Sequence, residues 1–508
     1  MVTAISADTG QEAGRREALL LALGFIFLSL SAVVLAWAST LNPGTDRSAG
    51  YRGFLLILPA WAASAWVLHR ALNRWLPSRD PLLLPCGMML MGWGLLAVWR
   101  LLPEFGARQL AWFLAAVGIL YEIFRMRSAT PWLRRYRLVW LSLGLFLLAL
   151  TLFFGTNPSG AEARLWLGCC GQYMQPSEPL RLLLIAYLAS YFADRLMPGS
   201  DQPAREGLGP ILLPLIVVWG LAVALLAVQR DLGAGSLFLA LLAMLLFVVS
   251  RRWEALAIGL LLLLTAGAAA TSFSDVVRAR IETWLNPWSD PLTTSYQTLQ
   301  GLLAMAAGGL LGTGPGFGSP GLVPAVHTDY IIAAIVEEWG LAGGLGLLAL
   351  LAVLTGRGLR AATRSRDAYA AILGAGLSIA IGLQAVLIIG GVVRLLPLTG
   401  IPLPFVSYGG SSLLTTAVSL ALLIRISAHP GERPRFARSI RRVHTASLAL
   451  WAALALALGW WTVVRGPELR ARPENPRSAA PVPVPQDAAS QTAGVSGRSL
   501  GAVPAARC

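Results

Sequence analysis

The sequence contains no lysine, and its 40 basic residues are all arginine. Charged residues of either sign make up 13% of the 508 residues, compared with about 25% in ordinary soluble domains. Hydrophobic residues make up 56%, compared with about 45–50% in such domains. This shortage of charge excludes a soluble globular protein.

Cysteine is also scarce. The four cysteines are Cys86, Cys169, Cys170 and Cys508. Their spacing matches neither a disulfide framework nor a set of metal ligands. The adjacent Cys169 and Cys170 are expected to be two ordinary thiols.

Long apolar runs are abundant. A bilayer core about 30 Å thick needs about 20 consecutive apolar residues per helix. Thirteen such segments are expected, at residues 18–40, 53–70, 81–102, 108–125, 137–155, 178–196, 209–228, 233–250, 254–272, 330–355, 370–391, 407–427 and 444–465. The predicted fold is therefore an all-α polytopic membrane protein. The first run is too long for a signal peptide, so it is expected to be a retained anchor.

The positions of the arginines explain the net charge of +15. A strongly basic chain can bind nucleic acid, but 24 of the 40 arginines lie in alternate connections between the apolar segments. This alternation is typical of cytoplasmic loops in membrane proteins. It predicts a cytoplasmic N-terminus, no nucleic-acid partner and, because the segments are odd in number, an external C-terminal tail.

Two segments outside the apolar runs are long. Residues 273–329 form the largest connection, which is expected to be external. Within it, residues 298–312 are apolar and glycine-rich but too short to span, so they are expected to be re-entrant or to lie on the bundle. Residues 466–508 are rich in alanine, proline, serine and arginine and lack apolar periodicity, which predicts a disordered tail.

Asp329 ends the long external connection and precedes the helix expected at 330–355. A carboxylate there can cap the helix, which stabilises it by about 1 kcal/mol. It can also act as a general base that takes a proton from a substrate hydroxyl. Position alone leaves both roles open.

Glu337 and Glu338 lie two turns deeper, at about 12 Å for a rise of 1.5 Å per residue. Ionisable groups at such depth usually face a cavity or a partner. Glu337 is about 80° around the helix from Asp329, so it could share the same cleft. Glu338 is nearly opposite, and an ion pair with an arginine elsewhere in the bundle is the favoured interpretation.

Other polar segments interrupt the apolar pattern near the expected external mouth of the bundle. Glu178 and Arg181 have the i, i+3 spacing of a helical ion pair, and they also offer an anion and a cation to a charged head group. Residues 229–233 make a polar break, and residues 402–412 contain small residues suited to close helix approach. The glycine-rich run 311–318 lacks the preceding strand and the Lys-Ser/Thr ending of a nucleotide-binding loop, so a bend is expected there.

Taken together, these segments resemble the SEDS family (shape, elongation, division and sporulation) of the FtsW, RodA and SpoVE type. The matching motifs, in order, are QPSE at 175–178, QRDLG at 229–233, NPWSDP at 286–291, SYQTLQ at 295–300, GGLLGTGPGFG at 308–318, HTD at 327–329, EEWG at 337–340 and PLPFVSYGGSS at 402–412. Each motif is weak alone, but eight in this order are specific.

The resemblance covers residues 82–426, or ten helices. It implies an N-terminal extension with two extra helices at 1–80, a SEDS-like core at 81–428, a basic loop and one extra helix at 429–465, and the tail at 466–508.

The resemblance also implies a function: polymerisation of lipid II into glycan strands at the outer face of the bacterial cytoplasmic membrane. The family's catalytic aspartate corresponds to Asp329. Joining an α-linked pyrophosphate donor into a β-linked product inverts the anomeric carbon, so one displacement with one base is enough. Arg181 or a divalent cation is expected to stabilise the pyrophosphate that leaves. The implied partner is a class B penicillin-binding transpeptidase.

The implied substrate-binding residues are Glu178, Arg181, Trp166, Arg164, His327, Thr328, Glu337, Ser407 and Ser411.

Three departures from the family pattern affect this expectation. The usual Arg-Trp pair is replaced by Leu165 before Trp166, with Arg164 one position earlier. A usual asparagine is Ile388, and a usual glycine is Arg394. Because it lies in an apolar run, Arg394 is expected to reach a carboxylate or to extend outward to water.

The sequence also permits two other functions. A transporter or flippase of a lipid-linked sugar would use Glu337 and Glu338 as a proton relay, but no internal duplication typical of transporters is found in the sequence. A non-catalytic scaffold for division or elongation proteins would not need Asp329 at all.

Overall fold

The computed structural model describes residues 2–41, 47–157, 164–169, 172–195, 208–365, 367–431 and 436–477. In chain order its elements are α1 (Val2–Leu41), α2 (Arg47–Trp75), α3 (Leu83–Leu101), α4 (Pro103–Arg125), α5 (Ala129–Arg135), α6 (Arg137–Phe154), β1 (Leu167–Cys169), β2 (Gln172–Met174), α7 (Ser177–Arg195), α8 (Leu208–Val228), α9 (Leu232–Ser250), α10 (Glu254–Phe273), α11 (Asp275–Leu285), α12 (Tyr296–Gly308), η1 (Pro320–Leu322), α13 (Ile331–Ala362), α14 (Ala368–Val392), α15 (Gly410–Ala428), α16 (Ala437–Gly459), the π-helical η2 (Trp460–Val464) and α17 (Gly466–Arg470).

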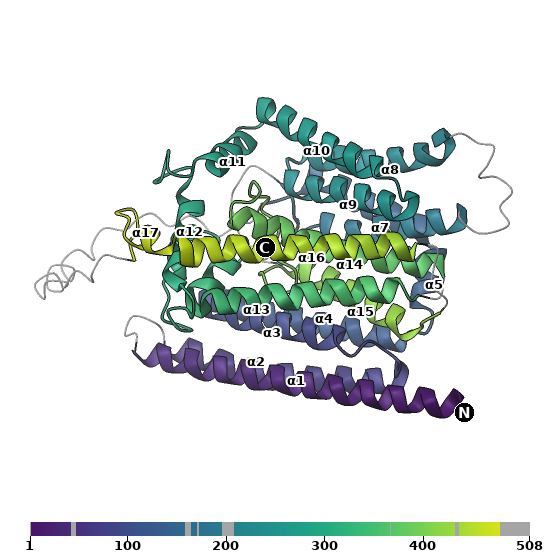
Figure 1. Ribbon diagram of the computed structural model, residues 1–508, viewed down its shortest axis with the longest axis horizontal. Coiled ribbons are helices and arrows are strands. Elements are labelled where there is room, and N and C mark those ends of the chain that lie inside the picture. Colours follow the sequence, from purple (N-terminus) through teal and green to yellow (C-terminus); the bar gives the residue numbers. More distant parts are fainter. Residues whose placement is uncertain are drawn as a thin grey trace, which may run out of the picture.

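The long helices lie side by side along the longest axis of the molecule, with α1 and α2 along one edge and α8 and α10 along the opposite edge (Figure 1). Eleven helices of the described residues are long and apolar enough to cross a membrane. The predicted all-α polytopic fold is therefore confirmed. The two other predicted spans coincide with α7, which contains four charged residues, and with α8, whose described apolar part is shorter.

The direction of the helices defines two ends of the bundle. The site end is the one where α13 begins and α14 ends, and it contains Asp329. The arginine-rich end is the opposite one, where α4 ends at Arg125 and α6 begins at Arg137. The sequence predicts that the arginine-rich end faces the cytoplasm.

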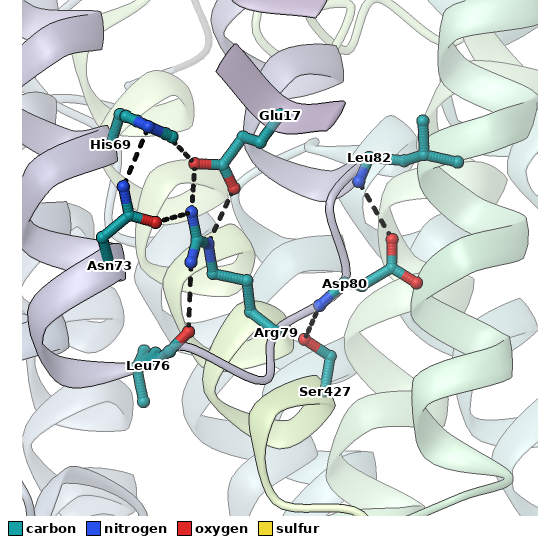
Figure 2. A network of polar contacts seen from close by, with 8 residues as sticks. All are labelled: Glu17, His69, Asn73, Leu76, Arg79, Asp80, Leu82 and Ser427. Atoms are coloured by element: carbon teal, nitrogen blue, oxygen red, sulfur yellow. Dashed lines mark hydrogen bonds and ion pairs between the residues drawn. The ribbon is translucent and has the colours of Figure 1, made fainter. Parts of the chain in front are cut away.

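A buried polar network at the arginine-rich end joins the two extra N-terminal helices to the connection before α3 (Figure 2). The Glu17 carboxylate of α1 is fully buried and accepts hydrogen bonds from Arg79 Nε (2.8 Å) and Nη2 (2.6 Å). His69 Nδ1 of α2 lies 2.6 Å from the same carboxylate. Asp80, which follows Arg79 in the sequence, donates its backbone N–H to Ser427 Oγ of α15 (3.0 Å). The extension is thus tied to the core by hydrogen bonds as well as by apolar packing.

The helix α13 is interrupted at Gly340, whose φ of +67° belongs to the left-handed region that favours glycine. The backbone groups freed by this break pair with the glycine-rich run before α13. These bonds are Thr313 N to Glu337 O (2.9 Å), Gly314 N to Glu338 O (3.0 Å), Leu341 N to Gly309 O (2.9 Å) and Ala342 N to Leu310 O (3.1 Å). Because two N–H groups of the run already donate to α13, it is a bend held by the broken helix and not a phosphate-binding loop.

The short apolar piece predicted at 298–312 forms most of α12, which is buried against α13. Gly308 makes the close approach possible, because a Cβ there would lie 1.9 Å from the Val336 carbonyl oxygen. The Tyr330 hydroxyl and Thr298 Oγ1 lie 3.0 Å apart and join the two helices near the site end.

The chain after the last span folds back onto α12. The helix α17 packs beside α12 (Figure 1), and Leu469 is completely buried. Disorder was predicted from residue 466, but residues 466–477 are ordered by these contacts and by an ion pair of Arg477. The rest of the predicted tail, residues 478–508, lies outside the described residues, as do Cys170 and Cys508.

Candidate active site

The backbone before α13 holds Asp329 in place. Ala325 has a φ of +48°, and its carbonyl oxygen accepts the Asp329 N–H (3.2 Å) and the Thr328 N–H (3.2 Å). The next side chain, Tyr330, is completely buried. Asp329 therefore lies on a tight turn that is anchored by a buried aromatic ring.

Asp329 lines a cavity of about 280 Å³ at the site end. The other lining residues come from α11 (Val276, Ala279, Arg280, Thr283, Trp284), from α12 and the turn before it (Thr294, Gln297, Thr298), and from the end of α14 and the segment after it (Gly391, Arg394, Leu396, Leu398). The cavity thus combines one carboxylate with two arginines and several hydroxyl groups.

Arg280 is the cation that faces Asp329. Its Nη1 donates to the carbonyl oxygen of Thr399 (3.2 Å). A Cβ added at the next residue, Gly400, would lie 3.1 Å from Arg280 Nη2 and 3.6 Å from Asp329 Oδ2. Gly400 also has a φ of +71°, so a glycine at this position lets both charged groups approach the same point of the backbone.

Burial raises the pKa of Asp329 to about 6, and the charge of Arg280 opposes this rise. A general base is most useful when its pKa lies near the operating pH. At neutral pH Asp329 is therefore mostly ionised and able to accept a proton.

His327, Thr328 and Ser407 lie beside Asp329 but do not line its cavity. Ser407 Oγ donates to the carbonyl oxygen of Thr328 and accepts the N–H of Leu403 (2.9 Å). The His327 carbonyl oxygen accepts a hydrogen bond from Tyr408 N (2.9 Å), and burial lowers the pKa of His327. The structure thus places these three predicted residues where they hold the backbone that positions Asp329.

A second polar group surrounds Asp231, the N-cap of α9. Its Oδ1 accepts a hydrogen bond from the N–H of Ala234 (3.0 Å), and its Oδ2 accepts one from Gln175 Nε2 (3.1 Å). Burial raises the pKa of Asp231, and Arg280 is among the groups that oppose this rise. The electrostatic influence of Arg280 therefore reaches both Asp231 and Asp329.

The remaining residues of the QPSE region belong to this second group. Glu178 and Arg181 form a buried ion pair (3.0 Å), as their spacing predicted. Gln175 donates its backbone N–H to Ser411 Oγ (2.9 Å), which joins the residues just before α7 to α15. Glu178, Arg181 and Ser411 are not among the residues that line the Asp329 cavity.

Trp166 and Arg164 lie in the connection between α6 and α7. The backbone of Trp166 pairs in both directions with Thr156 (2.8 and 3.2 Å), next to the antiparallel hairpin in which Leu167 faces Met174. Arg164 is exposed. The structure does not bring either side chain to the lining of the Asp329 cavity.

The two glutamates of α13 are each paired with an arginine. Glu337 Oε1 binds Arg477 Nε (2.8 Å) and the N–H of Ser319 (2.9 Å), so it does not share the cavity of Asp329 as its helical position suggested. Glu338 Oε1 lies 3.4 Å from Arg100 Nη2. The prediction of an arginine partner for Glu338 is confirmed.

Arg394, the residue in place of a usual glycine, keeps a glycine-like backbone with a φ of +60°. Its guanidinium donates to the carbonyl oxygens of Trp284 (2.7 Å) and Leu285 (3.2 Å) and lies 5.6 Å from the ring centre of Trp461. Arg394 was expected to reach a carboxylate or to extend outward to water. Instead, its guanidinium binds backbone carbonyl groups at the end of α11. Ile388, in place of the usual asparagine, is buried in α14.

Arg280 and Arg477 were not singled out from the sequence. Arg280 lies on α11, a short helix of the long connection at 273–329. Its sequence neighbours do not indicate that it lies near Asp329. In the described part of the chain, no three or more His, Cys, Asp or Glu side chains gather in a way that could hold a metal ion.

Fold and site together define a multi-pass membrane protein with a cavity that combines a carboxylate and two arginines at one end of its helical bundle. The sequence matches the model of the FtsW/RodA/SpoVE family, described as cell cycle proteins, over residues 86–432. The chain belongs to this family.

Several relatives cover most of the chain. The sequence is 34% identical over 440 residues to the peptidoglycan glycosyltransferase RodA of Mycobacterium bovis, which covers 83% of this chain and 92% of that protein. It is 33% identical to the stage V sporulation protein E of Bacillus subtilis, covering 64% of this chain and 87% of that protein.

Solved structures share the fold. One chain, reported under "Structural coordination of polymerization and crosslinking by a peptidoglycan synthase complex", has a TM-score of 0.56 at 27% identity and covers 68% of this chain and 96% of its own. The rod shape determining protein RodA of Thermus thermophilus has a TM-score of 0.50 at 25% identity. The match covers 68% of this chain and 95% of that protein's chain.

Proposed function

We propose that this protein is a peptidoglycan glycosyltransferase that polymerises lipid II, with Asp329 as its general base. The observation that carries the proposal is the cavity that Asp329 shares with Arg280 at the site end of the bundle. The family and the activity named for its relatives support the same reaction.

In the proposed reaction, the acceptor sugar lies with one hydroxyl against the Asp329 carboxylate. As that oxygen bonds to the anomeric carbon of the donor, its proton passes to Asp329, and the bond from the anomeric carbon to the pyrophosphate breaks. Attack from the face opposite the pyrophosphate inverts this carbon, so a single displacement forms the β-linkage.

Arg280 has two roles in this proposal. Its charge opposes the effect of burial on Asp329 and keeps the carboxylate ionised. It also lines the cavity, so it is better placed than Arg181, which is paired with Glu178, to stabilise the negative charge on the leaving pyrophosphate.

The position of the site in the bundle indicates the membrane face on which it acts. We place the protein in the bacterial cytoplasmic membrane with the site end facing outward, because the arginine-rich end fits a cytoplasmic face. A structural neighbour belongs to a peptidoglycan synthase complex, which supports a class B penicillin-binding transpeptidase as the partner.

A polymerisation assay tests the proposal. The purified full-length protein in detergent is incubated with lipid II, and the glycan products are separated on a gel. We expect polymer with the natural protein and none with Asp329→Ala, while Asp275→Asn, an exposed carboxylate on α11, keeps its activity. Polymer formation by Asp329→Ala at the natural rate would overturn the assignment.

A further inference from the structure

A second and larger cavity lies at the arginine-rich end, remote from the candidate active site. It encloses about 720 Å³ between α5, the start of α6, the end of α7 and the start of α14. The helix α14 runs from this cavity to the Asp329 cavity, and its 25 residues correspond to about 37 Å at 1.5 Å per residue. The two cavities are therefore separate sites.

The lining carries an excess of positive charge. Arg134, Arg135 and Arg137 face two aspartates, which leaves one net positive charge. Arg134 and Arg137 share the single carboxylate of Asp194. The other aspartate, Asp367, accepts the N–H of Ala370 (2.7 Å) and caps α14, so its charge is also engaged by a helix N-terminus.

Tyr369, which lines the same cavity, carries a buried hydroxyl group without a partner. Tyr369 is 3% exposed, and its hydroxyl makes no hydrogen bond to any of the described residues. The guanidinium of Arg134 lies over its ring, 5.4 Å from the ring centre. A buried hydroxyl without a partner is costly, so a ligand oxygen that accepted its proton would remove this cost.

The wall of the cavity formed by the first turn of α6 is apolar and open. Leu138 and Val139 are 61% and 59% exposed, and they follow Arg137 directly along the chain. A cationic floor with hydroxyl and guanidinium donors suits a phosphate group, and an exposed apolar wall suits hydrocarbon chains. A free phosphate ion would use the first feature and not the second.

We propose that this cavity binds the phosphate head group of an anionic phospholipid, with the acyl chains leaving over Leu138 and Val139. Basic pockets between membrane helices bind such head groups in other proteins. In the bound state Arg135 and the Tyr369 hydroxyl donate to the phosphate oxygens, and Arg134 and Arg137 remain paired with Asp194. The proposal does not depend on the reaction assigned to Asp329.

Two variants test the site without breaking its ion pairs. Tyr369→Phe removes one hydroxyl that has no partner in the described protein, and Arg135→Gln removes an exposed charge whose contact is the ring of Tyr136. Arg442→Gln is the matched control, because Arg442 is an exposed arginine of α16 outside this cavity. Thermal unfolding of each protein in detergent without added lipid checks that the variants are folded.

The measurement is lipid binding to the purified full-length protein, by native mass spectrometry and by the rise of the unfolding temperature. Phosphatidylglycerol, phosphatidylcholine and inorganic phosphate are titrated separately. We expect tighter binding of phosphatidylglycerol than of phosphatidylcholine. We also expect Arg135→Gln to weaken it about tenfold and Tyr369→Phe to weaken it about fivefold, with no change for Arg442→Gln.

Three results would overturn the proposal. Unchanged phosphatidylglycerol binding in both cavity variants would mean that the lipid binds elsewhere. Equal loss in Arg442→Gln would mean that general surface charge attracts the lipid. Binding of inorganic phosphate as tight as that of phosphatidylglycerol would assign the cavity to a free ion.

Discussion

Arg477 Nε lies 2.8 Å from Glu337 Oε1, so a residue beyond the last helix of the bundle neutralises a carboxylate within α13. Arg477 Nη1 also donates to Gln300 Oε1 of α12 (2.9 Å). Both members of the pair are almost fully buried, with 7% and 1% of their side chains exposed. The C-terminal segment therefore fastens α12, whose Thr298 lines the candidate active site, to α13.

Arg477→Gln should destabilise the protein by about 3 kcal/mol, because removing one partner leaves a buried charge uncompensated. Chemical or thermal unfolding in detergent measures the loss. Combining it with Glu337→Gln should cost less than the sum of the two single variants. Strict additivity of the two effects would show that the pair does not couple in solution.

The break in α13 leads to a second prediction. A Cβ at Gly340 would lie 2.3 Å from Gly312 N and 2.4 Å from the Leu310 carbonyl oxygen, and the residue has a positive φ. Gly340→Ala should therefore cost about 2 kcal/mol or more of unfolding free energy.

Gly346→Ala is the matched control for this prediction, because it lies on the same helix and a Cβ there meets nothing within 4 Å. Its stability should stay unchanged or rise slightly. Equal stability of Gly340→Ala and Gly346→Ala would argue against the broken helix.

The helical segments could be predicted from the sequence, because apolar length alone identifies them. The Glu178–Arg181 pair was predictable for a similar reason, since its partners are three residues apart on one helix. Arg280 and Arg477 were not predictable in this way. Each arginine meets its carboxylate only after segments that are distant in the sequence pack together. The spacing of the residues around each arginine does not indicate such a contact.

The position of Glu337 shows the limit of reasoning from helical rotation. The angle between Asp329 and Glu337 assumes that both residues lie on one helix, whereas α13 begins at Ile331 and Tyr330 has a non-helical φ of −113° and ψ of 20°. In addition, α12 contributes to the surroundings of both residues. Thr298 of α12 lines the Asp329 cavity, whereas Gln300 binds the Arg477 that pairs with Glu337. A rotation angle cannot reveal a neighbouring helix.

The pH dependence of the reaction tests the electrostatics of the site. Because Asp329 must be deprotonated to act as a base and its pKa is about 6, kcat/KM should rise with pH and reach half its plateau near pH 6. Arg280→Gln removes a charge that lowers this pKa, so the midpoint should move to higher pH.

Arg278→Gln is the control for Arg280→Gln, because it removes the same charge from an exposed position of α11. Its profile should match that of the natural protein. An equal upward shift in both variants would mean that general charge, and not the facing position of Arg280, sets the midpoint.

The most direct test of the central claim separates substrate binding from bond formation in Asp329→Asn. This variant keeps the size of the side chain and removes the base. We predict that it binds lipid II with a Kd within a few-fold of the natural value, while the rate of glycosidic bond formation falls at least about 100-fold. A bond-forming rate within tenfold of the natural protein would contradict the assignment of Asp329 as general base.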